Sequence, residues 1–198
     1  GIYKNILVVA AEKMSTVVDY TDRSTCVLFG DGAAAGVVSD VASGFELKNI
    51  SLGADGSQGD MMIVPGGGSA NPASEETVKN KMHYFRMNGK EVFKTAIRTM
   101  ETVAQECVEG AGLTMQDIRW LIPHQANTRI IDTLAKRSPL PTERIYNEVW
   151  RYGNTSGSSV AIAMNDLLKE KGVSSGDNLL LVAFGAGLSW GAVILETL

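Results

Sequence analysis

Two side chains of this protein stand out for the chemistry that they could do. The first, His124, lies in Pro123-His-Gln-Ala-Asn127, directly after an apolar run over 118–122 that predicts a strand. The carboxyl end of a strand is where open α/β sheets place ligands, and an imidazole can donate or accept a proton near neutral pH. A histidine there can equally be a satisfied loop residue, so position alone leaves both interpretations open.

The second, Asn154, lies in the run Arg151-Tyr-Gly-Asn-Thr-Ser-Gly-Ser-Ser159. Glycine and small hydroxyl residues let the backbone approach a ligand closely, and an asparagine amide can donate an N–H there. The same residue types are typical of the start of a helix, which we expect over 156–171. Asn154 can therefore cap this helix, face a ligand, or do both.

A glycine-rich loop, Phe184-Gly-Ala-Gly-Leu-Ser-Trp-Gly191, lies between two predicted strands, 178–184 and 192–195. Such a loop can aim backbone N–H groups at an oxygen that becomes negative during a reaction. A plain tight β-turn explains the same residues, so this feature is a weaker indication than the other two.

Neither cysteine has the setting of a nucleophile. Cys26 falls within a predicted strand, 25–29, and Cys107 falls on the apolar face of a predicted helix, 90–111, so we interpret both as inert core thiols. We find no Cys/His cluster with the spacing of a zinc site and expect no metal. His83 stands among basic residues and is interpreted as a surface residue.

The elements that must position these residues alternate between strands and helices. Apolar residues recur at three- and four-residue spacing over 90–111, which predicts the longest helix, and shorter helices are expected over 128–137 and 156–171. Buried strands are predicted at 6–11 and 25–29, other strands at 45–52, 118–122, 178–184 and 192–195, a hairpin or close backbone approach at 30–36, and a surface loop at 53–74. This order predicts an α/β fold with helices on both faces of a sheet.

Composition narrows the class of protein. The chain has 198 residues, of which 44% are hydrophobic, with 18 basic and 22 acidic side chains and a net charge of -4. These values are typical of a soluble globular protein and argue against a non-specific nucleic-acid binder. The apolar run 6–11 is too short for a signal peptide, and strands around a glycine loop explain the uncharged span 178–195 better than a membrane helix does. Two cysteines favour a reducing compartment, and a start at Gly1 suggests the C-terminal portion of a longer protein.

Charge is unevenly distributed. Between residues 79 and 98 the sequence has six basic residues and one acidic residue, Glu91. A solvated helix face is one explanation. A cavity mouth that attracts a phosphorylated ligand or an acidic protein is the other.

Together these segments resemble one family of thiolase-fold condensing enzymes, the 3-oxoacyl-acyl-carrier-protein synthase III family. The matching motifs follow the family's order over nearly the whole chain. They are Thr21-Asp-Arg-Ser-Thr25, Phe29-Gly-Asp-Gly-Ala33, Met87-Asn-Gly-Lys-Glu-Val-Phe-Lys94, Pro123-His-Gln-Ala-Asn127, Tyr152-Gly-Asn-Thr-Ser156 and Ala183-Phe-Gly-Ala-Gly-Leu-Ser-Trp-Gly191. The resemblance implies a thiolase-like layered α/β/α/β/α sandwich, with residues 1–55 ending its N-terminal half and residues 56–198 forming its C-terminal half. It also implies a cytoplasmic homodimer.

The resemblance implies a Cys-His-Asn site, in which His124 and Asn154 match the histidine and the asparagine. The family's cysteine lies upstream of the segment that matches Gly1, so the N-terminal portion of the same protein is an expected partner. In the implied reaction this cysteine takes an acetyl group from acetyl-CoA, and malonyl-acyl carrier protein then loses carbon dioxide and attacks the thioester. His124 and Asn154 would stabilise the enolate oxygen, and the backbone N–H of Ala186 would serve a second oxyanion hole.

The resemblance also implies binding roles, with acyl-CoA as substrate and no permanently bound cofactor. A pantetheine tunnel, an adenine contact and a docking surface for the acidic acyl carrier protein are expected. The tunnel residues are Gly89, Phe93, Ala96 and Asn127, the adenine contact is Arg23, and the docking residues are Lys94, Gln125 and Arg129. We expect neither nucleic acid nor a membrane as a partner.

Related enzymes differ at identifiable positions. Elongating ketosynthases have a second histidine where this chain has Asn154, and thiolases have a second catalytic cysteine near the C-terminus, which this sequence lacks. Two alternatives stay open: a catalytically inactive CoA-binding or scaffold fragment, and a ketosynthase III homologue that makes a secondary metabolite.

Overall fold

The computed structural model describes residues 2–198. Its strands are β1 (Asn5–Glu12), β2 (Gly32–Ser39), β3 (Phe45–Ala54), β4 (Met62–Ile63), β5 (Arg86–Met87), β6 (Ile118–Pro123), β7 (Asn178–Gly185) and β8 (Ser189–Thr197). Its α-helices are α1 (Glu75–Lys79), α2 (Gly89–Gly110), α3 (Thr128–Arg137), α4 (Val149–Tyr152) and α5 (Ser159–Glu170). Short 3₁₀ turns cover Met14–Thr16, Gly56–Met61, Met115–Asp117, Thr142–Arg144 and Ser156–Ser158.

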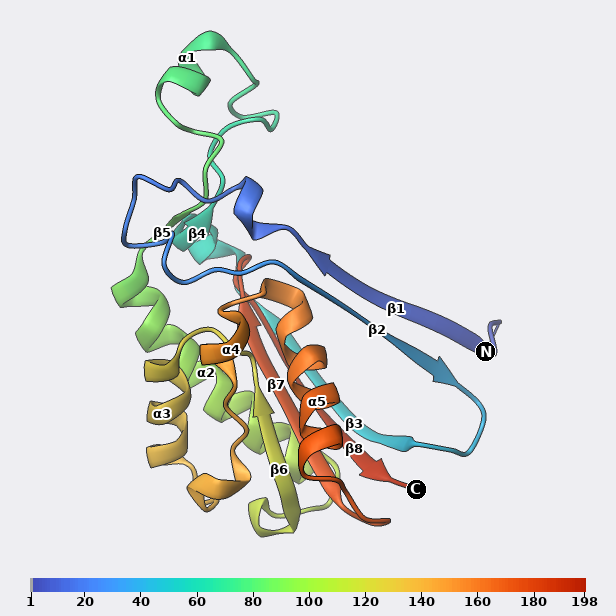
Figure 1. Cartoon of the computed structure of the whole chain (residues 1–198). Coiled ribbons are helices and arrows are strands. Elements are labelled where there is room, and N and C mark those ends of the chain that lie inside the picture. Colours follow the sequence, from blue (N-terminus) through green and yellow to red (C-terminus); the bar gives the residue numbers. More distant parts are fainter. Residues whose placement is uncertain (1) are drawn as a thin grey trace.

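A four-stranded sheet in the order β3-β8-β7-β6 forms the centre of the molecule (Figure 1). Strands β6 and β7 run parallel, whereas the other pairs are antiparallel. Side chains alternate between its two faces along β7: Leu180 and Val182 pack with α2 and α3, whereas Leu179 and Leu181 pack with α5. Helices therefore cover both faces, as the sequence predicted.

The long hairpin β1–β2 adds a further layer beyond α5. Helix α5 contacts β2 on the side away from the sheet, and the Ser156–Ser158 turn contacts both strands of the hairpin. The order of layers is thus helices α2 and α3, central sheet, helix α5, hairpin (Figure 1). This arrangement confirms the expected layered α/β fold.

The long helix α2 lies where the three- and four-residue spacing of apolar residues predicted it. The Asn88 side chain accepts a hydrogen bond from the Glu91 N–H at the start of the helix. Gly112, with φ of 72°, takes the left-handed conformation just beyond its end. The apolar face, including Met100 and Val103, is buried against the sheet. Helix α3 also has its predicted bounds.

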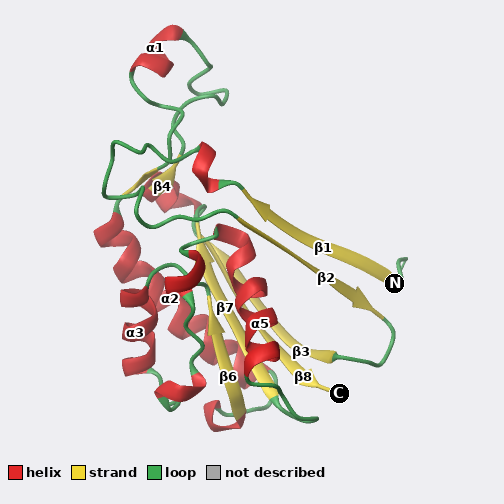
Figure 2. Cartoon of the chain, viewed as in Figure 1, coloured by secondary structure: helices red, strands yellow, loops and turns green. Residues whose placement is uncertain are grey.

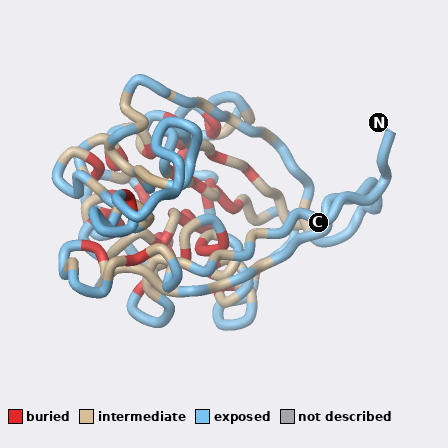
Figure 3. The backbone as a smooth tube through the Cα atoms, turned by 90° about the horizontal axis from the view of Figure 1, so that it is seen from above, coloured by how far each residue is buried: buried red, intermediate tan, exposed pale blue. Residues whose placement is uncertain are grey.

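The strand predicted at 6–11 exists, but its predicted burial is wrong. Leu7 is 65% exposed and its partner Val37 is 69% exposed. Figure 3 shows this hairpin in pale blue, extending away from the body of the molecule. Within residues 2–198, α5 and the Ser156–Ser158 turn contact only part of the hairpin, which leaves much of its apolar surface uncovered.

The strand predicted at 25–29 is not formed, and the chain turns there instead. The Asp22 carboxylate accepts hydrogen bonds from the Ser24 N–H at 2.9 Å and from the Thr25 hydroxyl at 2.9 Å, which favours turns over extended backbone. Only Phe29 makes a β-bridge, with Asn154. Cys26 consequently lies in a turn and is partly exposed, not in the middle of a strand.

Residues 30–36 do not form a separate hairpin, because residues 32–36 belong to β2. The close backbone approach that was the other prediction is confirmed at Gly30. A Cβ atom at Gly30 would overlap the carbonyl oxygen of Tyr152, so only glycine allows these two backbone segments to lie this close.

The segment between β4 and β5 is a long excursion that carries α1 away from the sheet (Figure 2). It is mostly loop, as predicted for its first part. His83 is half-buried there, and its Nε2 lies 3.0 Å from the Thr77 hydroxyl, so its interpretation as a surface residue is wrong. In the described part of the chain, no helix combines the length and the apolar character that a membrane crossing requires.

Candidate active site

One large cavity, of about 1400 Å³, lies at the end of the central sheet where β6 and β7 finish. His124, Asn154 and Ala186 all line this cavity. They come from three separate connections: β6 to α3, α4 to α5, and β7 to β8. The fold therefore brings together the three residues that the sequence singled out for chemistry.

His124 is fixed on one side and free on the other. Its backbone N–H donates to the Val182 carbonyl at 2.7 Å, and its ring Nδ1 lies 2.6 Å from the Ser159 hydroxyl oxygen. Its Nε2 makes no hydrogen bond within residues 2–198. Burial lowers the pKa of His124 from its usual 6.5 to about 4. The imidazole is consequently neutral at pH 7, with one N–H to donate.

Asn154 is held through its backbone. Its N–H donates to the Leu28 carbonyl at 2.8 Å, and its carbonyl accepts from the Gly30 N–H at 3.0 Å. Its side-chain oxygen accepts from the Ser156 N–H at 2.9 Å. The amide Nδ2 has no partner among the residues described, which leaves its two N–H groups available to the cavity. Asn154 thus bonds the turn that leads into α5 and lines the cavity, but it does not cap the helix, because Thr155 and Ser158 hold the cap positions.

The backbone on either side of Asn154 is unusual. Gly153 has φ of 71°, and Ser156 has φ of 51° although it is not a glycine. Left-handed conformations of non-glycine residues are uncommon and concentrate at functional sites. Ser156 also lines the cavity.

Ala186 lies in the short connection between β7 and β8. Its carbonyl accepts a hydrogen bond from the Ser189 hydroxyl at 3.0 Å, which closes a tight turn. In the part of the chain that the structure describes, its backbone N–H has no hydrogen-bond acceptor. The loop is therefore both a tight turn and the site of a free N–H.

The predicted tunnel residues Gly89, Phe93, Ala96 and Asn127 also line the cavity, as do Lys94 and Arg129. Asn127 uses its side-chain oxygen to cap α3, accepting from the Ile130 N–H at 3.0 Å. The guanidinium of Arg129 lies 5.6 Å from the centre of the Phe93 ring, which joins the start of α3 to the start of α2.

Comparison with known proteins identifies the family. The model of the C-terminal part of 3-oxoacyl-[acyl-carrier-protein] synthase III matches residues 108–197, and a second model of 3-oxoacyl-[acyl-carrier-protein] synthase III matches residues 1–56. The chain belongs to the synthase III family.

Relatives of known sequence and structure agree with this assignment. The chain is 52% identical to the beta-ketoacyl-[acyl-carrier-protein] synthase III of Chlamydia muridarum over 197 residues, which are 99% of this chain and 60% of that protein. It matches the crystal structure of the synthase III of Aquifex aeolicus with a TM-score of 0.84 at 42% identity, over 98% of this chain and 58% of that one. The synthase III structure of Thermus thermophilus matches with a TM-score of 0.87 at 41% identity, over 98% and 59%. The chain thus spans about 60% of the length of the curated relatives it matches.

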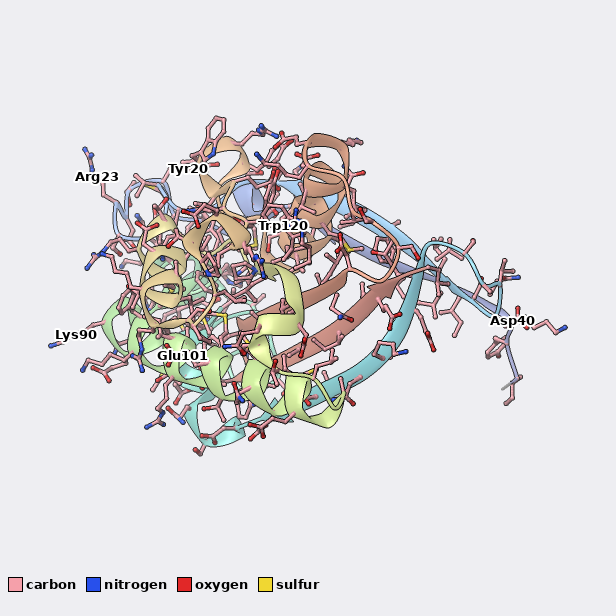
Figure 4. The ribbon with its side chains drawn as sticks, turned by 90° about the horizontal axis from the view of Figure 1, so that it is seen from below. Tyr20, Arg23, Asp40, Lys90, Glu101 and Trp120 are labelled. Atoms are coloured by element: carbon pink, nitrogen blue, oxygen red, sulfur yellow. The ribbon has the colours of Figure 1, made fainter. Side chains whose placement is uncertain are left out.

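Two residues that the family resemblance singled out do not line the cavity. Gln125 is 2% exposed, and its amide donates to the carbonyls of Pro123 and Tyr146 while its oxygen accepts from the Glu148 N–H. Buried and bonded in this way, Gln125 has no surface to offer a partner protein, which corrects its expected docking role. Arg23 is exposed and points into solvent (Figure 4).

The two cysteines of this chain lie outside the cavity lining. Cys107 is fully buried on α2, and burial raises the pKa of its thiol, so it stays protonated. Cys26 lies in the turn before Phe29. Within residues 2–198, no group of three or more His, Cys, Asp or Glu side chains is placed to hold a metal ion.

Ser159 is the site residue that sequence reasoning missed. It is 2% exposed and contacts the ring of His124 from the first turn of α5. The only available signal was the run of small and hydroxyl residues over 155–159, for which the sequence left helix capping and a close approach to a ligand both open. Nothing in that run distinguishes a serine that bonds backbone from one that bonds a histidine far away in sequence.

Proposed function

We propose that this chain is the C-terminal part of an initiating ketosynthase of type II fatty-acid synthesis. The observation that carries the proposal is that two side-chain nitrogens, Nε2 of His124 and Nδ2 of Asn154, have no partner among the described residues and belong to side chains lining one cavity. Two neutral N–H donors are suited to an oxygen that gains negative charge, because they stabilise the charge without neutralising it by proton transfer.

In the proposed reaction, a cysteine thiolate from a portion outside this chain attacks the carbonyl carbon of acetyl-CoA and releases coenzyme A. Malonyl-acyl carrier protein then enters the cavity and loses carbon dioxide. The electron pair of the broken carbon–carbon bond forms an enolate, whose carbon attacks the acetyl thioester and expels the cysteine. His124 and Asn154 donate to the enolate oxygen as it forms. One such donor is worth roughly 3 kcal/mol, or about a hundredfold in rate.

Other residues would serve the second oxyanion and the substrate arm. The free N–H of Ala186, with the N–H of the cysteine, would stabilise the tetrahedral oxyanion of the acetyl thioester. Gly89, Phe93 and Ala96 would enclose the pantetheine arm, and Asn127 would bond it; all four line the cavity. Arg23, exposed beside the lining residue Ser24, would contact the adenine of coenzyme A.

The carrier protein would dock on the basic face where α2 and α3 begin. Lys90, Lys94 and Arg129 are exposed there and line the cavity, and Figure 4 shows Lys90 pointing into solvent. Lys94 pairs with Glu91 at 3.1 Å, whereas Arg129 has no carboxylate partner within residues 2–198. Positive charge at the cavity mouth would attract an acidic partner and its phosphorylated arm.

The assembly implied by this function is also a proposal. Residues 1–55 would end the N-terminal half of a thiolase-like sandwich, and residues 56–198 would form the C-terminal half, which agrees with the family models that match residues 1–56 and 108–197. The protein would act as a cytoplasmic homodimer, with acyl-CoA as a substrate and without a resident cofactor or metal.

A labelled-acetyl assay tests the function. Protein that includes its cysteine-bearing portion is mixed with labelled acetyl-CoA, with and without malonyl-acyl carrier protein. We expect label on the protein when malonyl-acyl carrier protein is absent, and labelled 3-oxobutanoyl-acyl carrier protein when it is present. Retention of coenzyme A binding with no acetyl transfer would overturn the proposal in favour of an inactive binding or scaffold protein.

A further inference from the structure

Ser159 has one hydrogen-bonding partner that is not backbone, and it is the ring of His124. The hydroxyl oxygen lies 2.6 Å from Nδ1 of His124 and 3.3 Å from the backbone nitrogen of Gln125. Both Ser159 and Gln125 are 2% exposed, so water does not compete for these bonds. The first residue of α5 is thereby tied to the end of β6, across the interface between a helix and the sheet.

The direction of the bond to His124 follows from counting donors. The Gln125 N–H can only donate, so the Ser159 oxygen accepts there. Among the residues described, no acceptor other than Nδ1 lies within bonding distance of the Ser159 hydroxyl. If the ring donated from Nδ1, the hydroxyl proton would be buried without a partner, which is unfavourable. The hydroxyl therefore donates, and Nδ1 accepts.

We propose that Ser159 is a positioning residue that holds His124 in the tautomer with its proton on Nε2. A neutral imidazole carries a proton on only one of its two nitrogens. Occupying Nδ1 as an acceptor leaves that proton on Nε2, the nitrogen without a partner. The catalytic consequence of this arrangement rests on the proposed function, because only a protonated Nε2 can donate to the enolate oxygen. The tautomer itself does not depend on that function.

Neighbouring Ser158 supplies a matched control. It is also buried, at 0% exposure, but its hydroxyl donates to the Thr155 carbonyl at 2.8 Å and does not contact the histidine. Ser158→Ala and Ser159→Ala each remove one buried hydroxyl from the same turn. A loss of stability from removing a buried hydroxyl should thus occur in both variants, whereas a change in the tautomer of His124 should occur only in Ser159→Ala.

The test combines nitrogen NMR with kinetics on protein that includes its cysteine-bearing portion. The ¹⁵N-histidine signals of His124 are assigned by their loss in His124→Gln. We expect the Nε2–H tautomer in the native protein and in Ser158→Ala, and a mixture of tautomers in Ser159→Ala. A native ring protonated on Nδ1, or an unchanged tautomer in Ser159→Ala, would overturn the assignment.

Kinetics separate this inference from the proposed function. For malonyl-acyl carrier protein decarboxylation, Ser159→Ala should lower kcat about tenfold with KM within about twofold, and Ser159→Thr, which keeps the hydroxyl, should restore most of the rate. If the tautomer shifts while kcat stays unchanged, Ser159 positions the ring as proposed, and the donor role of His124 in the proposed function is wrong.

Discussion

His124 and Asn154, the two side chains that the proposed function makes catalytic, are each bonded on one side only. Ser159 occupies Nδ1 of His124, and the Ser156 N–H occupies the side-chain oxygen of Asn154. The remaining nitrogens, Nε2 and Nδ2, have no partner within residues 2–198. Both nitrogens belong to side chains that line the cavity, which is why the pair indicates a binding site.

The low pKa of His124 has a consequence for stability. The pKa is about 4 in the folded protein against the usual 6.5, so between these values the unfolded chain binds a proton that the folded chain does not. The free energy of unfolding should therefore fall as pH drops from about 7 to 4, by roughly 2 to 3 kcal/mol from this group.

Urea unfolding of the native protein and of His124→Gln at pH 7.5 and pH 4.5 measures this contribution. The native protein should lose more stability on acidification than the variant does. Equal losses in both proteins would show that the histidine is not kept neutral by burial.

The sequence predicted His124 and Asn154 as site residues because each lies in a distinctive motif. It did not predict Ser159, because a serine in the first turn of a helix is an ordinary finding. It misplaced Gln125, whose neighbours in sequence line the cavity while its own side chain points into the core. Side-chain direction in a loop depends on tertiary packing, which motifs do not record.

Among the elements, the segment before β2 positions Asn154. Phe29 bridges to Asn154, and the backbone at Gly30 lies against Tyr152 without room for a Cβ atom. The sequence correctly indicated a close approach near Gly30. It wrongly predicted a strand at 25–29, because β-branched and aromatic residues are common in strands. The Asp22 carboxylate accepts hydrogen bonds from residues 24 and 25, and these bonds favour turns there.

Gly30→Ala tests this contact between elements. The added methyl group must push the two segments apart, so we expect a loss of roughly 1 to 3 kcal/mol in the free energy of unfolding and a larger loss of activity than stability alone explains. Gly36→Ala is the matched control, because a Cβ atom at Gly36 meets nothing within 4 Å. Equal effects of the two substitutions on activity would argue against a role for this contact.

Reversing a charge on α3 tests the proposed docking surface. Arg129→Glu reverses an exposed charge at the cavity mouth, so it should raise KM for malonyl-acyl carrier protein about tenfold at low salt while leaving KM for acetyl-CoA near its native value. Steady-state kinetics at two salt concentrations would measure both constants. Lys169→Glu on α5 has the same charge change at an exposed position outside the cavity lining and should leave both constants unchanged. An unaltered carrier-protein KM in Arg129→Glu would remove this face from the proposal.

The sequence predicted the layers of the molecule, but it did not predict that the hairpin β1–β2 is exposed on one side. Helical periodicity and apolar strands predicted helices on both faces of a sheet, and the structure has them. The apolar strand β1 predicted a buried position, yet Leu7 and Val9 are 65% and 59% exposed. An apolar pattern indicates that a strand favours burial, but it does not indicate which residues would bury it.

Because its hairpin is exposed, we expect this chain to self-associate when it is produced by itself. Unpaired strand edges and apolar side chains favour contacts between copies. The double substitution Leu7→Lys and Val37→Lys, at a paired position of β1 and β2, should shift sedimentation toward the monomer. Val78→Lys, at an equally exposed valine on α1, is the control and should not. Identical sedimentation of the native protein, the double variant and Val78→Lys would show that the hairpin does not mediate self-association.

Asn154→Asp tests whether His124 and Asn154 donate together to one substrate oxygen. This substitution keeps the shape of the side chain and replaces its N–H donor with a second acceptor. Measured on protein that includes its cysteine-bearing portion, kcat for malonyl-acyl carrier protein decarboxylation should fall by about a hundredfold or more, while Asn165→Asp on the exposed side of α5 keeps the native rate. A folded Asn154→Asp protein whose kcat stays within about twofold of the native value would contradict the account.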